Sequence, residues 1–149
     1  VAVVGAGFVG GQAHVPAFNK IPGSQLVALG DQDEERIKKF SEKYHVKYYV
    51  EYDELLNDPR VNAVVLAVPT PFHFDMSMKA IGKAKHVLCE MPLAPTANQA
   101  YQLTKEAEKA GVAHRRGQNR QADGCRFQRI HRGEGSCGAV ASGFLGLGH

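Results

Sequence analysis

The sequence predicts an α/β fold built on a doubly wound parallel sheet, and three observations favour this class. Short apolar runs rich in valine alternate with helical patterns over residues 1–116, which is typical of successive βαβ units. Several runs, such as residues 63–68, are apolar throughout, as expected for strands covered on both faces. The first run also leads through a glycine-rich turn directly into a helical pattern.

The expected elements follow one another in a regular order. Strands are expected at residues 1–4, 25–29, 46–48, 61–68, 86–89 and 112–114. Helices are expected between them at residues 8–20, 33–44, 53–57, 72–82 and 96–110. The strands are assigned from their apolar and β-branched runs, and the helices from apolar residues that recur every three or four positions. The alternation places all the strands parallel in one sheet.

Polar residues mark the starts of two of these helices. Thr70, followed by Pro71, is predicted to cap the helix at residues 72–82 with its hydroxyl group. Thr96 and Gln99 have the spacing of a capping box. In the helix that follows, one face is expected to lie on the sheet, made by Ala100, Leu103, Thr104 and Ala107.

Composition excludes several classes of protein. With 44% hydrophobic and 22% charged residues, the chain is not intrinsically disordered. No apolar run approaches the ~20 residues of a membrane span, so no membrane association is expected. The three cysteines, Cys89, Cys125 and Cys137, suggest reduced thiols rather than a disulfide framework. Since no targeting peptide is visible at the start of the sequence, a cytoplasmic location is expected.

The character of the sequence changes after residue 116, which divides the chain into residues 1–116 and 117–149. The second segment holds 8 of the 16 glycines. Residues 114–149 also carry 6 arginines against 2 acidic residues. Such a basic tail could contact phosphates, but only Phe127 and Phe144 could stack on bases, so a nucleic-acid partner is not expected. No metal site is expected either, because no known zinc-ligand spacing fits the four candidates His114, Cys125, His131 and Cys137.

The first strand runs into the turn Gly5-Ala6-Gly7-Phe8-Val9-Gly10 and then into a helical pattern. This is the dinucleotide-binding fingerprint in its required context. Gly5 permits a tight turn, Gly7 allows the backbone to approach a pyrophosphate, and Gly10 allows the helix to lie close to the strand. The phosphates would contact backbone N–H groups at the positive end of the helix, those of Phe8 and Val9 included. The sequence therefore predicts a Rossmann dinucleotide-binding domain over residues 1–116.

Asp31 follows the second predicted strand, about twenty residues after Gly10. A carboxylate there can accept hydrogen bonds from the ribose hydroxyls and would repel a 2′-phosphate, which favours NAD over NADP. In an alternative interpretation Asp31 caps the next helix, a role that Asp33 would serve equally well. Arg36 argues against this preference, because an arginine at this edge could bind the 2′-phosphate of NADP. NADP is therefore the alternative cofactor.

Two further loops follow the fourth and fifth predicted strands, whose carboxyl ends share the edge where open parallel sheets bind ligands. In the first loop, Pro69 is expected to shape the chain, and Thr70 to contact the cofactor, cap the helix or do both. His73 either faces the substrate or begins a helix in which Phe72 and Met76 pack inward. His14, in the first predicted helix, is interpreted as a packed or solvated residue rather than a ligand.

Four motifs occur in a fixed order: Gly5-x-Gly7-x-x-Gly10, Asp31, Ala67-Val68-Pro69-Thr70-Pro71-x-His73 and His86-Val87-Leu88-Cys89-Glu90-Met91-Pro92-Leu93-Ala94. In this order they resemble the Gfo/Idh/MocA oxidoreductases, the family of glucose-fructose oxidoreductase and inositol dehydrogenase. The resemblance implies transfer of a hydride from a hydroxyl-bearing carbon of a sugar or cyclitol to NAD(P). It also implies a second, α+β domain that binds the substrate, of which residues 117–149 would be the truncated start.

The motif at Glu90 usually reads Glu-Lys-Pro in this family, and its lysine orients the cofactor and substrate and helps to move the hydroxyl proton. The resemblance places Met91 at that lysine position, and a thioether carries no proton. Glu90 would reach the ribose on the nicotinamide side, or would only satisfy backbone N–H groups. Two interpretations remain: an oxidoreductase or its N-terminal part, and a non-catalytic NAD-binding module that acts as a sensor or partner subunit. A homo-oligomer is expected only if the C-terminal domain is present.

The candidate site residues form two groups. The candidate catalytic residues are Glu90, Met91 and His73. The candidate cofactor-binding residues are Gly5, Gly7, Phe8, Val9, Gly10, Asp31, Pro69, Thr70, His73 and Glu90.

Overall fold

Six short strands form one parallel sheet in the computed structural model, which describes residues 1–116. The strands are β1 (Ala2–Val4), β2 (Ala28–Gly30), β3 (Lys47–Tyr49), β4 (Ala63–Leu66), β5 (His86–Cys89) and β6 (His114–Arg116). Their order across the sheet is β3-β2-β1-β4-β5-β6, and every neighbouring pair is parallel. The prediction of a doubly wound parallel sheet is therefore confirmed. The predicted second segment, residues 117–149, lies outside the described residues, as do Cys125, His131 and Cys137.

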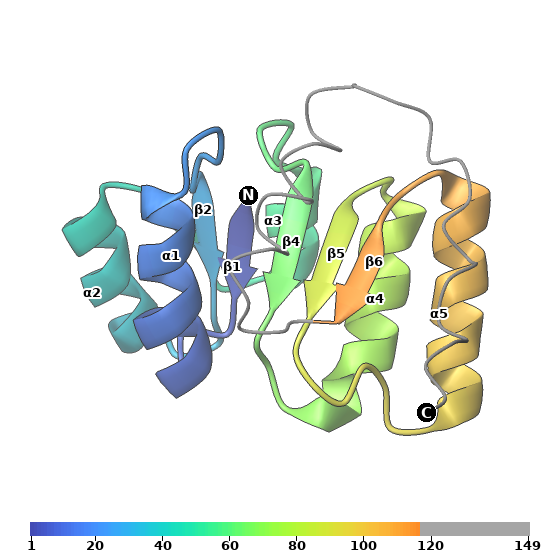
Figure 1. Cartoon of the computed structure of the whole chain (residues 1–149). Helices are drawn as coiled ribbons and strands as arrows, with labels where there is room; N and C mark the ends of the chain where they lie inside the picture. Colours follow the sequence, from blue (N-terminus) through green and yellow to red (C-terminus); the bar gives the residue numbers. More distant parts are fainter. Residues whose placement is uncertain (117–149) are drawn as a thin grey trace, which may run out of the picture. The chain divides into compact units, whose positions relative to one another are not determined.

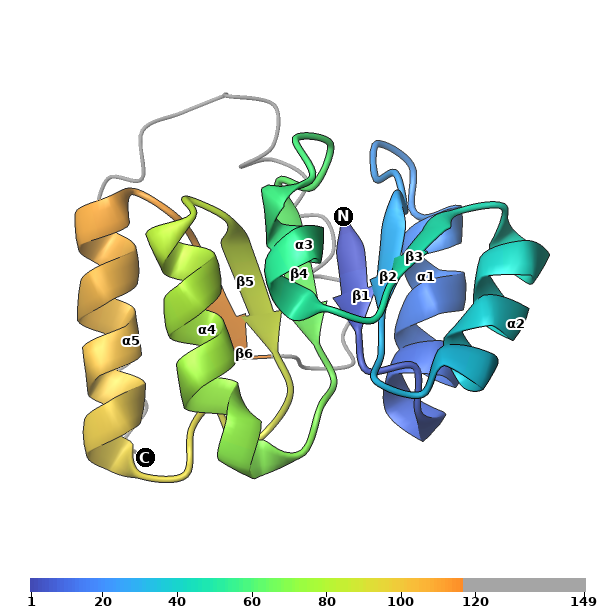
Figure 2. The same ribbon diagram turned by 180° about the vertical axis from the view of Figure 1, so that it is seen from behind.

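Helices cover both faces of this sheet. The π-helical turn η1 (Gly10–His14) continues into α1 (Val15–Lys20), and α2 (Glu34–Tyr44) lies beside them on the same face. The opposite face is covered by α3 (Tyr52–Asn57), α4 (His73–Gly82) and α5 (Ala97–Ala110). A 3₁₀ turn, η2 (Thr70–Phe72), precedes α4. Figure 1 shows α1 in front of the sheet, and Figure 2 shows α3 and α4 in front of it. The chain therefore changes face between β3 and β4, which makes β1 and β4 neighbours at the centre.

The main core lies between the sheet and α3, α4 and α5. Every second residue of a strand points into it, for example Ala2 and Val4 of β1, and Val87 and Cys89 of β5. Burial raises the pKa of the Cys89 thiol to about 12, so it stays protonated at neutral pH. No helix within residues 1–116 is both long and apolar enough to cross a membrane.

Strand ends and helix caps differ in part from the sequence prediction. β2 begins at Ala28 instead of residue 25, because it pairs with β1, whose first paired residue is Ala2. The predicted Thr96 cap is confirmed, since its hydroxyl accepts a hydrogen bond from the Gln99 N–H at 3.3 Å, whereas the Gln99 side chain accepts the Thr96 hydroxyl at 3.1 Å instead of the backbone N–H of a full capping box. The predicted Thr70 cap is wrong, since Thr70 is the first residue of η2 and the capping position belongs to Pro69, with no side-chain cap hydrogen bond.

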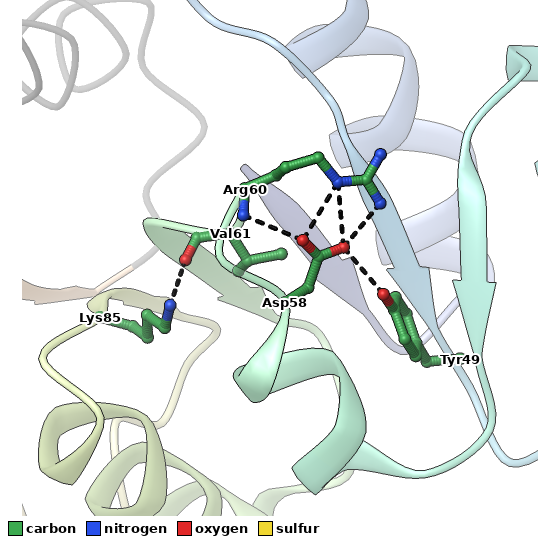
Figure 3. Close-up of polar contacts among 5 residues, drawn as sticks. All are labelled: Tyr49, Asp58, Arg60, Val61 and Lys85. Atoms are coloured by element: carbon green, nitrogen blue, oxygen red, sulfur yellow. Dashed lines mark hydrogen bonds and ion pairs between the residues drawn. The ribbon is translucent and has the colours of Figure 1, made fainter.

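A polar cluster around one buried carboxylate joins the loop between α3 and β4 to the end of β3 (Figure 3). The buried Asp58 carboxylate accepts hydrogen bonds from the Tyr49 hydroxyl at 2.8 Å and from the Arg60 side chain, where Nη2 lies 2.6 Å from Oδ2. It also accepts the Arg60 backbone N–H at 2.9 Å. Next to this cluster, Lys85 Nζ donates to the Val61 carbonyl at 2.5 Å. The hydrogen bonds from Arg60 hold the pKa of Asp58 well below its ordinary value.

We expect Asp58→Asn to lower the free energy of unfolding at pH 7 by about 1–3 kcal/mol, because charge-assisted hydrogen bonds at a buried group are lost. Since the folded-state pKa of Asp58 is lowered, its contribution is complete above the unfolded value of about 4 and falls as the pH drops below it. Urea unfolding at pH 7 and pH 3.5 measures both effects. Asp53→Asn is the control, because Asp53 forms only an exposed ion pair with Lys79. Equal losses in the two variants would contradict the prediction.

Candidate functional site

The chain between β1 and η1 forms a tight turn at the carboxyl edge of the sheet. Gly5 has a φ of +90°, a left-handed conformation that favours glycine, and its N–H donates to the Gly30 carbonyl at 2.7 Å. A Cβ on Gly5 would lie 2.4 Å from the Ala67 carbonyl oxygen. The turn is therefore enclosed between the ends of β2 and β4, and residue 5 must be glycine.

The other two fingerprint glycines differ in what surrounds them. A Cβ on Gly10 would lie 1.7 Å from the Gly5 carbonyl oxygen, so the helix packs directly on its own turn. A Cβ on Gly7 would meet no atom of residues 1–116 within 4 Å, and Gly7 does not have a positive φ. The Phe8 side chain is 79% exposed, and Val9 is also exposed. Nothing within the described chain thus requires glycine at position 7.

Asp31, directly after β2, is hydrogen-bonded to this turn. Its Oδ2 accepts the Ala6 N–H at 2.6 Å and its Oδ1 accepts the Asp33 N–H at 2.9 Å. The cap of α2 is Asp33, which accepts the Arg36 N–H at 3.0 Å. Arg36 lies between the two acids, with Nη2 2.7 Å from Asp33 and Nη1 3.5 Å from Asp31. Of the two acids, Asp31 is therefore the one that lies against the glycine turn.

The loop after β4 is held to the loop after β5 by one side chain. His73 is 1% exposed, and its ring nitrogens lie 2.7 Å from the Val68 carbonyl and 2.6 Å from the Pro92 carbonyl. The prediction that Phe72 packs inward is wrong, because Phe72 is 53% exposed. Since α4 begins at His73, this residue rather than Phe72 lies on the inner face of the helix. His73 thus joins two loops instead of presenting a free imidazole.

Glu90 and Met91 follow β5, and Glu90 is hydrogen-bonded to another side chain whereas Met91 is exposed. The Glu90 Oε1 atom lies 2.6 Å from Nε2 of His14, a contact across 76 residues of sequence. The Met91 side chain is 57% exposed. His14 is thus packed, as the sequence suggested, with only 12% of its side chain exposed, but its pairing with Glu90 becomes apparent only from the order of the strands.

The structure thus gathers most of the candidate residues at one edge of the sheet. The glycine turn, Asp31, the residues 69–73 and the residues 90–91 all follow the carboxyl ends of parallel strands, where open α/β sheets bind their ligands. The first N–H groups of a helix have no partner within it, so those after Gly7 can bind an anion. Within residues 1–116, no three His, Cys, Asp or Glu side chains are grouped to hold a metal ion.

Comparisons with known proteins identify the same region. The family model GFO_IDH_MocA, described as an oxidoreductase family with an NAD-binding Rossmann fold, matches residues 1–117. An inositol 2-dehydrogenase of Rubrobacter xylanophilus is 33% identical over 111 residues, which are 74% of this chain and 32% of that protein. A myo-inositol 2-dehydrogenase of Thermotoga maritima is 31% identical over the whole chain, which corresponds to 42% of that protein. The chain thus spans well under half of these relatives.

Solved structures agree with this assignment. An NAD-binding oxidoreductase from Klebsiella pneumoniae is 35% identical with a TM-score of 0.72, over 89% of this chain and 38% of that one. GenD2 from gentamicin A biosynthesis, solved in complex with NAD, is 32% identical with a TM-score of 0.75, over 78% of this chain and 33% of that one. The fold of residues 1–116 is therefore that of a nicotinamide-cofactor domain.

Proposed function

Because the chain belongs to the GFO_IDH_MocA oxidoreductase family, whose matched domain is an NAD-binding Rossmann fold, we propose that residues 1–116 hold NAD for hydride transfer to and from a small polyhydroxylated substrate. The relatives include inositol dehydrogenases, which supports a sugar or cyclitol as the substrate class. We also propose that residues 117–149 are the start of a second domain, which binds the substrate.

Gly7 carries this proposal. Gly5 and Gly10 are required by neighbouring backbone atoms, whereas the position of a Cβ on Gly7 is open space. A glycine that its own chain does not need is explained if a ligand approaches the backbone there, as a pyrophosphate does in this fingerprint. Asp31 lies against the same turn. The residues present therefore fit a dinucleotide.

Each group at this edge has a distinct task in the proposal. The N–H groups after Gly7 bind the pyrophosphate, and Asp31 binds the adenosine ribose. Glu90, at the end of β5, faces the nicotinamide half. The bound nicotinamide supplies the acceptor or donor of the hydride. Met91 cannot move a proton, so the hydroxyl proton passes to a group other than the side chain of residue 91.

The charges around Asp31 favour NAD over NADP. A 2′-phosphate here would lie beside the carboxylates of Asp31 and Asp33, which repel it. Arg36 could attract it, but this guanidinium is already paired with Asp33 at 2.7 Å. We therefore propose NAD as the preferred cofactor.

Met91 supports a second candidate function, an NAD-binding module that acts as a sensor or partner subunit. Its exposed thioether stands where the resemblance expects a lysine. The two candidates differ in turnover, which is measured as NADH formed with inositol or another polyol. NAD binding without NADH formation favours the module.

We expect Gly7→Ala to weaken NAD binding at least tenfold while leaving the melting temperature at or slightly above the wild-type value. The new methyl group enters the space proposed for the pyrophosphate, and its Cβ meets no atom of residues 1–116 within 4 Å. Calorimetric titration with NAD and thermal unfolding measure the two effects. Gly82→Ala is the matched control, because its Cβ also meets no atom within 4 Å and it lies at the end of α4. NAD binding by Gly7→Ala equal to that of the control would overturn the proposal.

A further inference from the structure

His14 and Glu90 form a hydrogen bond that joins the helix after β1 to the loop after β5. Nε2 of His14 lies 2.6 Å from Oε1 of Glu90, and the two side chains are 12% and 27% exposed. On the basis of the proposed NAD site, we propose that His14 is a positioning residue that holds the Glu90 carboxylate toward the nicotinamide half of the cofactor.

The direction of Glu90 follows from the alternation along β5. Val87 and Cys89 point into the core beneath α4. The Glu90 N–H donates to the Leu66 carbonyl at 3.0 Å, so the pairing with β4 continues one residue beyond β5. Since successive residues of an extended chain point to opposite faces, the Glu90 side chain emerges on the other face, which is the face of α1.

The direction of His14 follows from the π-helical turn. The Val15 N–H donates to the Gly10 carbonyl, five residues earlier, instead of four as in an α-helix. Pro16 follows at once, lacks an N–H, and its ring crowds the carbonyl four residues before it. In an α-helix, each residue is rotated by about 100° about the helix axis relative to the one before it. The extra residue in the π-helical turn therefore changes the direction in which the His14 side chain points. His14 thereby reaches across to Glu90.

His14 is the side chain that fixes the Glu90 carboxylate. An ionised carboxylate only accepts hydrogen bonds, so the hydrogen lies on Nε2 of His14. From the described part of the chain, the second oxygen of Glu90 accepts only the Met91 N–H, at a longer 3.3 Å. Among the side chains of residues 1–115, Glu90 forms no ion pair with a lysine or arginine. Without His14, several rotamers of Glu90 would become available.

The strand order separates the two halves of the proposed ligand. Asp31 lies at the end of β2, on one side of β1, whereas Glu90 lies at the end of β5, on the other side. With the pyrophosphate at the start of the helix after β1, the adenosine lies toward Asp31 and the nicotinamide toward Glu90. A residue that acts through Glu90 should therefore affect the binding of NAD but not that of ADP.

Calorimetric titration of the full 149-residue chain with NAD and with ADP tests this proposal. We expect His14→Ala to weaken NAD binding about tenfold and ADP binding less than twofold. Glu90→Ala should do the same, and the double variant should bind NAD no more weakly than Glu90→Ala, because the two residues act as one unit. His14→Gln should recover most of the NAD affinity, since its amide can donate to Glu90. Gln12→Ala, an exposed residue of the same π-helical turn, should bind both ligands like the wild type.

The other outcomes overturn the proposal in different ways. Equal losses for NAD and ADP in His14→Ala would mean that the helix start, and not the carboxylate, had been disturbed. Additive losses in the double variant would mean that His14 and Glu90 act independently. Unchanged NAD binding in His14→Ala would remove the positioning role. Failure of the wild-type chain to bind either ligand would instead refute the proposed NAD site, and the role of His14 would fall with it.

Discussion

Gly10→Ala is expected to lower the free energy of unfolding by more than about 4 kcal/mol, the range in which single substitutions disrupt a fold. The new Cβ would lie 1.7 Å from the Gly5 carbonyl oxygen, closer than any two non-bonded atoms can approach. The Gly5 backbone cannot move aside, because its N–H is bonded to the Gly30 carbonyl. It is also packed against Ala67, so closely that a Cβ on Gly5 would lie 2.4 Å from the Ala67 carbonyl oxygen. Relief therefore requires that the helix separate from β1.

Urea unfolding followed by circular dichroism measures the loss. Gly7→Ala and Gly82→Ala are the controls, since neither added methyl group meets an atom within 4 Å. The expected result is a large shift of the midpoint for Gly10→Ala alone. A wild-type midpoint for Gly10→Ala would show that the helix after β1 does not pack on the Gly5 carbonyl.

His73→Leu is expected to lower the free energy of unfolding by about 1–3 kcal/mol, although leucine fills a similar volume. The substitution removes the ring nitrogens that lie against the Val68 and Pro92 carbonyls, and a carbonyl that loses its N–H donor costs about 1–3 kcal/mol where water cannot reach it. Since His73 joins the loops that carry Thr70 and Glu90, NAD affinity should fall as well.

The same urea titration and an NAD titration measure both effects. Phe72→Leu, at the neighbouring exposed position, is the control and should change the free energy of unfolding by less than about 0.5 kcal/mol. If both leucine variants unfold alike, the His73 ring does not hold the two loops together.

Most of the fold could be predicted from the sequence, because its signals are local. A strand–glycine turn–helix order specifies the opening βα unit, and the spacing of apolar residues specifies the faces of the longer helices. The capping signal of Thr96 predicts the correct helix start for the same reason. The Thr70 signal predicts a wrong cap, because Thr70–Phe72 form a 3₁₀ turn and α4 begins only at His73. As a result His73, and not Phe72, is the buried residue at the start of the helix.

The candidate site could be predicted only as far as local motifs reach. The glycines and Asp31 belong to one compact βα unit, so their spacing alone places them together. His14 and Glu90 are separated by 76 residues, and their contact depends on the strand order and on a π-helical turn that no apolar pattern reveals. The bond from Asp31 to the Ala6 N–H depends likewise on the pairing of β1 with β2.

The loop with Asp58 and Arg60 precedes β4, whereas the glycine turn follows β1, so these two loops lie at opposite edges of the same parallel sheet. A fluorescent dye attached near the exposed Arg60 side chain would consequently sit a full strand length away from any bound nucleotide. Its signal would follow unfolding of the domain without competing for the nucleotide. Melting curves recorded in this way, with increasing amounts of nucleotide, would yield dissociation constants from the upward shift in melting temperature.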